Sequence, residues 1–72
     1  MTKEQIYQLI QDSAANVLAH KSVRLGQSLS NTLFLHNRGL YESVMNSGVD
    51  PFYNDKKIVE FLKFLETKND NH

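Results

Sequence analysis

The chain has 72 residues, enough for one domain, and contains no cysteine, which excludes disulfide bonds and the commonest structural zinc sites. Eight basic residues balance eight acidic ones, so the molecule lacks the net positive field that would hold nucleic acid or an anionic membrane. No apolar run is long enough to span a membrane, and the opening MTKEQIYQLI lacks the apolar block of a signal peptide. We therefore expect a cytoplasmic protein.

The N-terminal part of the chain predicts one amphipathic helix. Apolar residues recur at steps of three and four from Ile6 to Leu18, and this spacing places them on one helix face. Thr2 and Gln5 have the form of a capping box, in which each side chain accepts a hydrogen bond from the other residue's backbone N–H. We expect a helix over about residues 3–20.

A second helix is predicted over about residues 22–36, with its apolar line at Leu25, Leu29 and Leu33. Gly26 interrupts this face. Because glycine destabilises a helix interior by about 0.5–1 kcal/mol relative to alanine, its presence needs a reason, and the commonest one is close approach of another helix.

The second half predicts two shorter helices. HNRGL ends the second helix, since asparagine and glycine tolerate left-handed dihedrals, and a third helix is expected over about residues 40–47. A fourth, over about residues 55–67, follows an N-cap at Asn54 or Asp55, and the polar residues 68–72 are expected to fray. No stretch alternates as a strand does, so we predict an all-α fold: a small bundle of three to four helices forming a single domain.

The size of the chain also predicts self-association. A domain this small buries only about 60% of the surface that its unfolded form exposes. Without disulfides or a metal, oligomerisation is the remaining common way to stabilise so small a fold. We expect a homodimer or a higher oligomer, which would cover the apolar faces that four short helices leave exposed.

The segment VDPFYND, between the last two predicted helices, admits a structural and a functional interpretation. Pro51 keeps the residue before it out of the helical region, so the chain must extend here. Phe52 and Tyr53 then point in opposite directions, one inward and one outward. The outward ring is a candidate anchor for a protein partner, with Arg24 and Arg38 at the rim, because aromatic residues and arginine dominate binding hot spots. A mainly structural role for the motif stays open.

Basic residues flank the expected start of the second helix, where free backbone N–H groups and the helix dipole already favour an anion. Lys21, Ser22, Arg24 and Gln27 are therefore candidates for binding a phosphate or a partner's carboxylate. In the alternative, Lys21 compensates the C-terminus of the first helix and Arg24 pairs with an acidic residue of the last helix.

The sequence offers no constellation for catalysis or metal binding. The histidines, His20, His36 and His72, lack the short spacing of metal ligands. There is no cysteine nucleophile, no serine lies in a recognisable elbow, and Glu60 and Glu66 do not form an acid pair on one helix face. We expect neither an enzyme nor a cofactor or metal.

Two segments, RLGQSLSNTL and YESVMNSGVDPFYNDKKIVEFLKFL, carry a resemblance to a loose group of small uncharacterised phage and prophage proteins. These proteins share an RLGQ, Asn, DPFY-D and FL pattern, which this chain matches from Arg24 to Leu62. The first predicted helix lies outside the resemblance, and SLSN is more polar than the pattern leads us to expect. The resemblance implies an origin in a mobile element, and so the cytoplasm of a bacterial host, but nothing about chemistry.

These observations lead to three hypotheses of function. The first is a non-enzymatic phage-type interaction protein that self-associates and that binds and modulates a host or phage protein, for example as an inhibitor. The second is a protein that binds or sequesters a nucleotide-like anion between two copies of Lys21 and Arg24. The third is a weak DNA-binding accessory protein, which the zero net charge disfavours.

Overall fold

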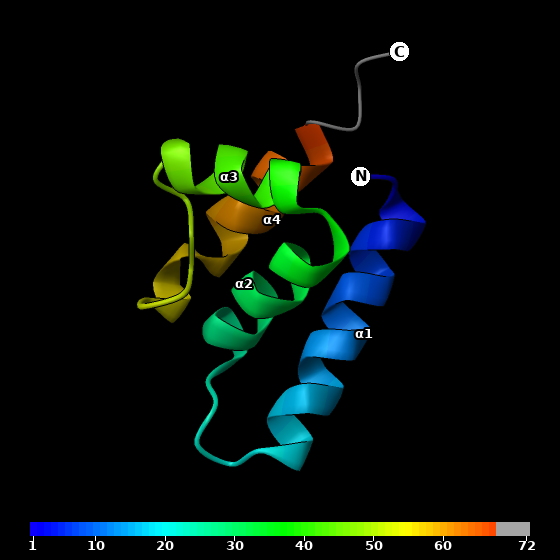
Figure 1. The fold of residues 1–72 in the computed structure, drawn as a ribbon, viewed down its shortest axis with the longest axis vertical. Helices are drawn as coiled ribbons and strands as arrows, with labels where there is room; N and C mark the ends of the chain where they lie inside the picture. Colours follow the sequence, from blue (N-terminus) through cyan, green and yellow to red (C-terminus); the bar gives the residue numbers. More distant parts are fainter. Residues whose placement is uncertain (68–72) are drawn as a thin grey trace.

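The computed structural model describes residues 1–67. It contains α1 (Lys3–Ala19), α2 (Leu25–His36), α3 (Arg38–Asn46), the 3-10 helix η1 (Asp55–Lys57) and α4 (Ile58–Thr67). The predicted all-α fold is confirmed, since no strand occurs in the described residues. α1 and α2 form an antiparallel hairpin, α3 turns away at the end of α2, and α4 runs behind α2 (Figure 1). The predicted frayed tail, residues 68–72, lies outside the described residues.

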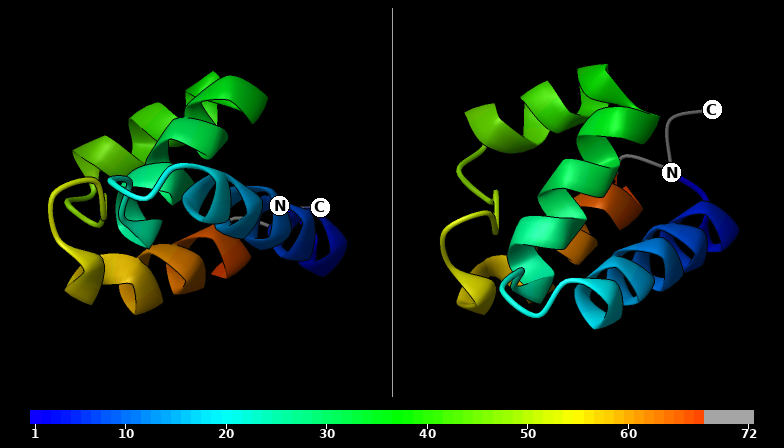
Figure 2. Two further views of the ribbon diagram at one scale, coloured as in Figure 1. Left: turned by 90° about the horizontal axis from the view of Figure 1, so that it is seen from below. Right: turned by 60° about the horizontal axis from the view of Figure 1, so that its bottom comes forward.

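The apolar core lies where the four α-helices meet, with α3 and α4 on opposite sides of the molecule (Figure 2). Every helix contributes its apolar stripe, because a single amphipathic helix cannot bury that stripe alone. The buried apolar side chains are Ile6, Leu9, Leu29, Leu33, Val44, Phe61 and Leu65. None of the helices within residues 1–67 has the length and apolar character needed to cross a membrane.

Small polar side chains contribute to the contact between α1 and α2 beside the apolar core. The Ser28 hydroxyl donates a hydrogen bond to the Ser13 carbonyl oxygen at 2.9 Å, and the Asn16 amide donates to Ser28 Oγ at 3.1 Å. Both serines are fully buried. Their small size lets the two helices approach closely, and the hydrogen bonds offset part of the cost of burying polar groups there.

The hairpin turn is longer than the sequence predicts. α2 begins at Leu25 instead of Ser22, because Lys21 and Ser22 form a turn in which the Val23 N–H donates to the His20 carbonyl oxygen at 3.0 Å. The predicted C-terminus of α2 matches the observed one, but α3 starts earlier than expected.

The early start of α3 is explained by Asn37, which caps two helices. Its backbone N–H donates to the Leu33 carbonyl oxygen at 2.7 Å, ending α2, and its side chain accepts from the Leu40 N–H at 3.1 Å, starting α3. Gly39 therefore lies within α3 and does not end a helix. Among the described residues, only Gly48 has a positive φ, of 74°.

Gly26 is buried in the first turn of α2, and the close approach that the sequence predicts at this position is present. A Cβ placed on Gly26 would lie 2.5 Å from Asp55 Oδ1 and nearer still to the Pro51 carbonyl oxygen. The approaching group is thus the segment that leads into α4, and not the face of another helix. Only a residue without a side chain fits here.

Replacing Gly26 by alanine should destabilise the fold. The added methyl group overlaps the segment from Pro51 to Asp55, and overpacking of this kind costs about 1–3 kcal/mol, more than the higher helix propensity of alanine returns. Urea unfolding followed by circular dichroism measures the change. Gly39→Ala is the matched control, because its Cβ would meet only Asn37 Oδ1, at 3.9 Å, and should leave stability equal or higher. Equal stability of Gly26→Ala and the original chain would contradict the close approach.

Candidate functional site

Hydrogen bonds hold the loop between α3 and η1 against α2. Asp50 Oδ1 accepts from the Ser30 hydroxyl and from the Phe52 N–H, the latter at 3.1 Å. Pro51 is fully buried, and the Arg24 guanidinium donates to the Phe52 carbonyl oxygen. These contacts fix the loop at both its side chains and its backbone, so its conformation is set by α2.

The carboxylate of Asp55 caps α2 from a different element. The N-cap residue of α2, Arg24, makes no side-chain capping hydrogen bond of its own. Instead, Asp55 Oδ1 accepts from the Gly26 N–H at 3.1 Å and from the Arg24 guanidinium at 2.8 Å. The carboxylate therefore satisfies a free N–H of the first turn, opposes the positive end of the helix dipole and pairs with the adjacent cation.

Asp55 is available for this contact because Asn54 caps the helix that follows. Asn54 Oδ1 accepts from the Lys56 N–H at 3.0 Å and starts η1, which runs directly into α4. Of the two residues expected at this N-cap, Asn54 takes the position. The carboxylate beside it is directed to α2.

The structure does not gather the four residues predicted to bind an anion. Lys21 and Ser22 are exposed in the α1–α2 turn, and Gln27 is half-buried in α2. Arg24 contacts Asp55, so a carboxylate of the chain itself occupies the place expected for an external anion. This arrangement agrees with the alternative in which Arg24 pairs with an acidic residue at the start of the last helical segment.

Phe52 and Tyr53 differ in burial, but they lie in a bend, and their side chains do not point in opposite directions as the sequence predicts. Phe52 is half-buried, whereas Tyr53 is 88% exposed. Their rings meet edge to face, with centroids 4.7 Å apart. Together with Tyr41, Met45 and Asp50 they line a pocket of about 400 Å³. The pocket has aromatic walls and contains one carboxylate.

Arg38 connects to this pocket through two ring contacts. Its guanidinium carbon lies 5.2 Å from the centroid of the Phe34 ring, a cation–π arrangement, and Phe34 meets Tyr41 edge to face at 5.3 Å. Arg38 Nε also lies 3.9 Å from Glu42 Oε2. We call the resulting set of residues the aromatic surface: Phe34, Arg38, Tyr41, Met45, Asp50, Phe52 and Tyr53.

Three of the four residues predicted to bind a partner belong to the aromatic surface. The fourth, Arg24, is instead engaged with the Phe52 carbonyl oxygen and Asp55. Sequence reasoning missed Tyr41 and Met45. A signal was present, because these two residues lie one helical turn apart and must share a face of α3.

The pocket shifts the acidity of Tyr41. Burial raises the pKa of its phenol above the ordinary 10.0, and the charge of Asp50 and the neighbouring Tyr53 raise the pKa further. Burial is the largest of these causes, because it disfavours the charged phenolate, and the nearby Asp50 carboxylate acts in the same direction.

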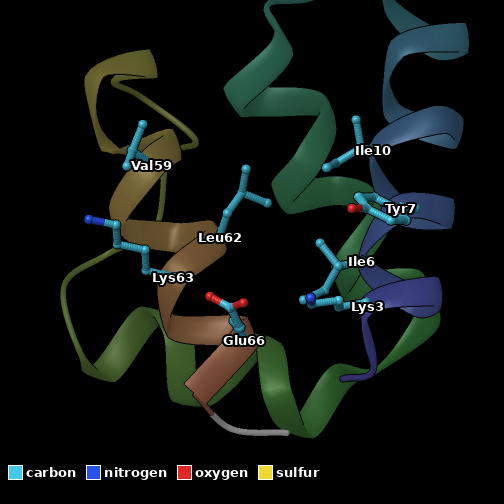
Figure 3. A pocket seen from close by; sticks show the side chains of 8 residues that line it. All are labelled: Lys3, Ile6, Tyr7, Ile10, Val59, Leu62, Lys63 and Glu66. Atoms are coloured by element: carbon cyan, nitrogen blue, oxygen red, sulfur yellow. The ribbon is translucent and has the colours of Figure 1, made fainter.

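A second concave surface lies between α1 and α4 (Figure 3). Ile6, Ile10 and Leu62 form the apolar part of this groove, which encloses about 290 Å³. Tyr7 on α1 and Val59 on α4 flank it and are 63% and 61% exposed. The other lining residues are charged: Lys3, Lys63 and Glu66.

The histidines occupy helix ends. His20 is the C-cap of α1, and His36 is the last residue of α2, with its Nε2 at 3.6 Å from Asp12 Oδ2. His72 lies outside the described residues. In the part of the chain that the structure describes, no group of three His, Cys, Asp or Glu side chains is arranged to hold a metal ion.

No family model, curated protein or solved structure matches this chain. The proposals for function therefore rest on the two concave surfaces, the aromatic surface and the α1–α4 groove.

Removing the Asp55 carboxylate should weaken the fold. Asp55→Ala deletes the acceptor for the Gly26 N–H and the partner of Arg24, and loss of a helix cap costs about 0.5–2 kcal/mol. Asp55→Asn retains a capping oxygen and should lose less. The measurement is the urea midpoint, with Glu60→Ala as a control that removes an exposed carboxylate from α4. If Asp55→Ala were no less stable than Glu60→Ala, the capping role would be wrong.

Proposed function

We propose that this chain is a non-enzymatic interaction protein of phage type, which binds and modulates a host or phage protein through the aromatic surface. The observation that carries the proposal is Tyr53, a large ring that is 88% exposed on a loop fixed by hydrogen bonds on both sides. Within the fold, the ring makes an edge-to-face contact with Phe52.

The anchoring of the loop makes Tyr53 suitable for binding. Asp50, three positions before it, bonds to Ser30, and Asp55, two positions after it, bonds to Gly26. Ordering a mobile loop on association lowers affinity, whereas a loop already held in place avoids most of that cost. The exposed ring is therefore preorganised.

The composition of the aromatic surface also fits a protein partner. Aromatic residues, methionine and arginine are the types enriched at protein interfaces, and tyrosine and arginine are frequent among the residues that dominate affinity. The aromatic surface has four aromatic rings, one methionine and one arginine. Arg38, stacked on Phe34, keeps its guanidinium partly available at the edge.

Tyr53→Ala should abolish partner binding and leave the fold intact. A photo-crosslinking amino acid at Met45, within the aromatic surface, should capture a specific protein from bacterial or phage-infected lysate, and Tyr53→Ala should reduce that product about tenfold or more, as expected of a hot spot. Because Tyr53 is exposed, the free energy of unfolding measured in urea should stay within about 0.5 kcal/mol of that of the original chain.

Leu18→Ala provides the matched control, since Leu18 is 85% exposed and lies on α1, away from the aromatic surface. Its crosslinked product should be unchanged. If Tyr53→Ala and the original chain gave equal yields of the crosslinked product, the proposal would be contradicted. A loss of stability in Tyr53→Ala would place the ring among the packing residues instead.

We further propose that two copies associate through the α1–α4 groove. The groove presents one stripe of α1 and one stripe of α4, and Lys3 and Glu66 face each other at one end of it (Figure 3). A two-fold axis would bring Glu66 of one copy near the lysines of the other, so the charges complement themselves. The zero net charge of the chain adds no repulsion between copies.

Val59→Lys should convert the dimer into a monomer. Val59 is exposed in the single chain, so the lysine is tolerated there, but a two-fold interface would bury the new charge twice. Light scattering after size-exclusion chromatography measures the mass. Leu18→Lys, an equal change outside the groove, should remain dimeric. A monomeric mass for the original chain at micromolar concentration would overturn this proposal.

A further inference from the structure

Asp50 is a half-buried carboxylate without a cationic partner. Among the described residues, no basic nitrogen lies within the 4.0 Å of an ion pair to it, whereas Asp12, Glu42 and Asp55 each have such a neighbour. Its Oδ1 accepts the hydrogen bonds from Ser30 and Phe52, and neither of these bonds uses Oδ2. A partly desolvated charge of this kind is stabilised when a cation approaches it.

Two basic residues that contact the loop are engaged elsewhere. Arg24 pairs with Asp55 and the Phe52 carbonyl oxygen, and the Lys57 ammonium donates to the Gly48 carbonyl oxygen at 3.1 Å. The fold therefore supplies neutral donors for Asp50, but it does not supply the countercharge.

The walls around Asp50 are themselves suited to a cation. Tyr41, Phe52 and Tyr53 line the same pocket, with Met45 completing it. The face of an aromatic ring is electronegative and attracts a cation within about 6 Å of its centroid. The pocket therefore combines three aromatic rings, which can accept a cation on their faces, with one carboxylate.

We propose that this pocket binds a cationic side chain of the partner protein, an arginine, whose guanidinium lies against the rings and pairs with Asp50. Arginine fits better than lysine because its planar guanidinium stacks on aromatic rings and is more weakly hydrated. The inference rests on the proposed function, since it names the chemistry of the partner that the aromatic surface would recognise.

The probe for the test is N-acetyl-L-arginine amide, titrated into the full chain and followed by two-dimensional NMR of the backbone amides. The signals of Tyr41, Met45 and Tyr53 should shift together with one saturable, millimolar affinity. Asp50→Asn should weaken this affinity about fivefold or more, by loss of the ion pair. The asparagine oxygen still accepts from Ser30 and Phe52, so the loop should keep its conformation, which the urea midpoint checks.

Two further variants control for folding and for general charge effects. Glu42→Gln removes one negative charge from α3 outside the pocket and should leave the affinity within about twofold of the original, because exposed charges are screened at physiological salt. Tyr53→Ala changes an exposed ring and should weaken binding even if Asp50→Asn proves unstable.

Small probes separate the possible ligands. 3,3-Dimethyl-1-butanol is a neutral isostere of choline and should not bind. If it binds as tightly as the arginine probe, the pocket does not recognise charge, and the proposal is wrong. Much tighter binding of choline than of the arginine probe would assign the pocket to a quaternary ammonium ligand and overturn the arginine assignment. Equal affinities of Asp50→Asn and the original chain would also overturn it.

Failure of this inference is distinguishable from failure of the proposed function. If Tyr53→Ala abolishes crosslinking to the partner but Asp50→Asn does not, and the arginine probe causes no shifts, the aromatic surface binds a partner without a cation in the pocket. If neither substitution affects crosslinking, the aromatic surface is not the binding site.

Discussion

The contact of the Asp55 carboxylate with Gly26 and Arg24 joins the two halves of this molecule. It caps α2, neutralises the cation at its start and fixes the position at which the chain enters α4. The contact requires glycine at position 26, because a Cβ there would overlap Asp55 and Pro51. The placement of the last third of the chain depends on this interaction as well as on burial of Phe61 and Leu65.

The same contact has a consequence for the loop. With Asp55 fixed after the loop and Asp50 fixed within it, the backbone between them has little freedom, and the side chain of Tyr53 projects from a rigid support. The fold therefore stabilises an exposed aromatic ring instead of hiding it. An exposed ring on a flexible loop would be unremarkable, because loops tolerate variable side chains. Here, hydrogen bonds of Asp50 and Asp55 fix the loop on both sides of the exposed ring.

Periodicity was sufficient to predict the four helices, since each has an apolar stripe that only one helix face can carry. The helix ends were less predictable. Asn37 caps two helices at once, so α3 starts directly after α2 ends, two residues earlier than predicted. Arg24 is an N-cap whose side chain pairs with a carboxylate 31 positions away, so local sequence could not locate the start of α2. For the site, alternation along extended chain predicted one exposed ring, but the structure places Phe52 and Tyr53 in a bend with their rings in contact. The pocket beside them was not predictable either, because the packing of α3 against the loop brings Tyr41 and Met45 there.

The structure also separates two kinds of residue within the segments RLGQ and DPFYND. Arg24, Gly26, Pro51 and Asp55 all act in holding the loop on α2, so a purely structural role accounts for them. Asp50 shares this role through its Oδ1, which accepts from Ser30 and from the Phe52 N–H. Phe52 contributes its backbone to the same contact and buries part of its ring. Tyr53 alone in DPFYND contributes a large apolar group and gains almost no burial from the fold. The motif is therefore a structural joint that leaves one large side chain exposed to solvent.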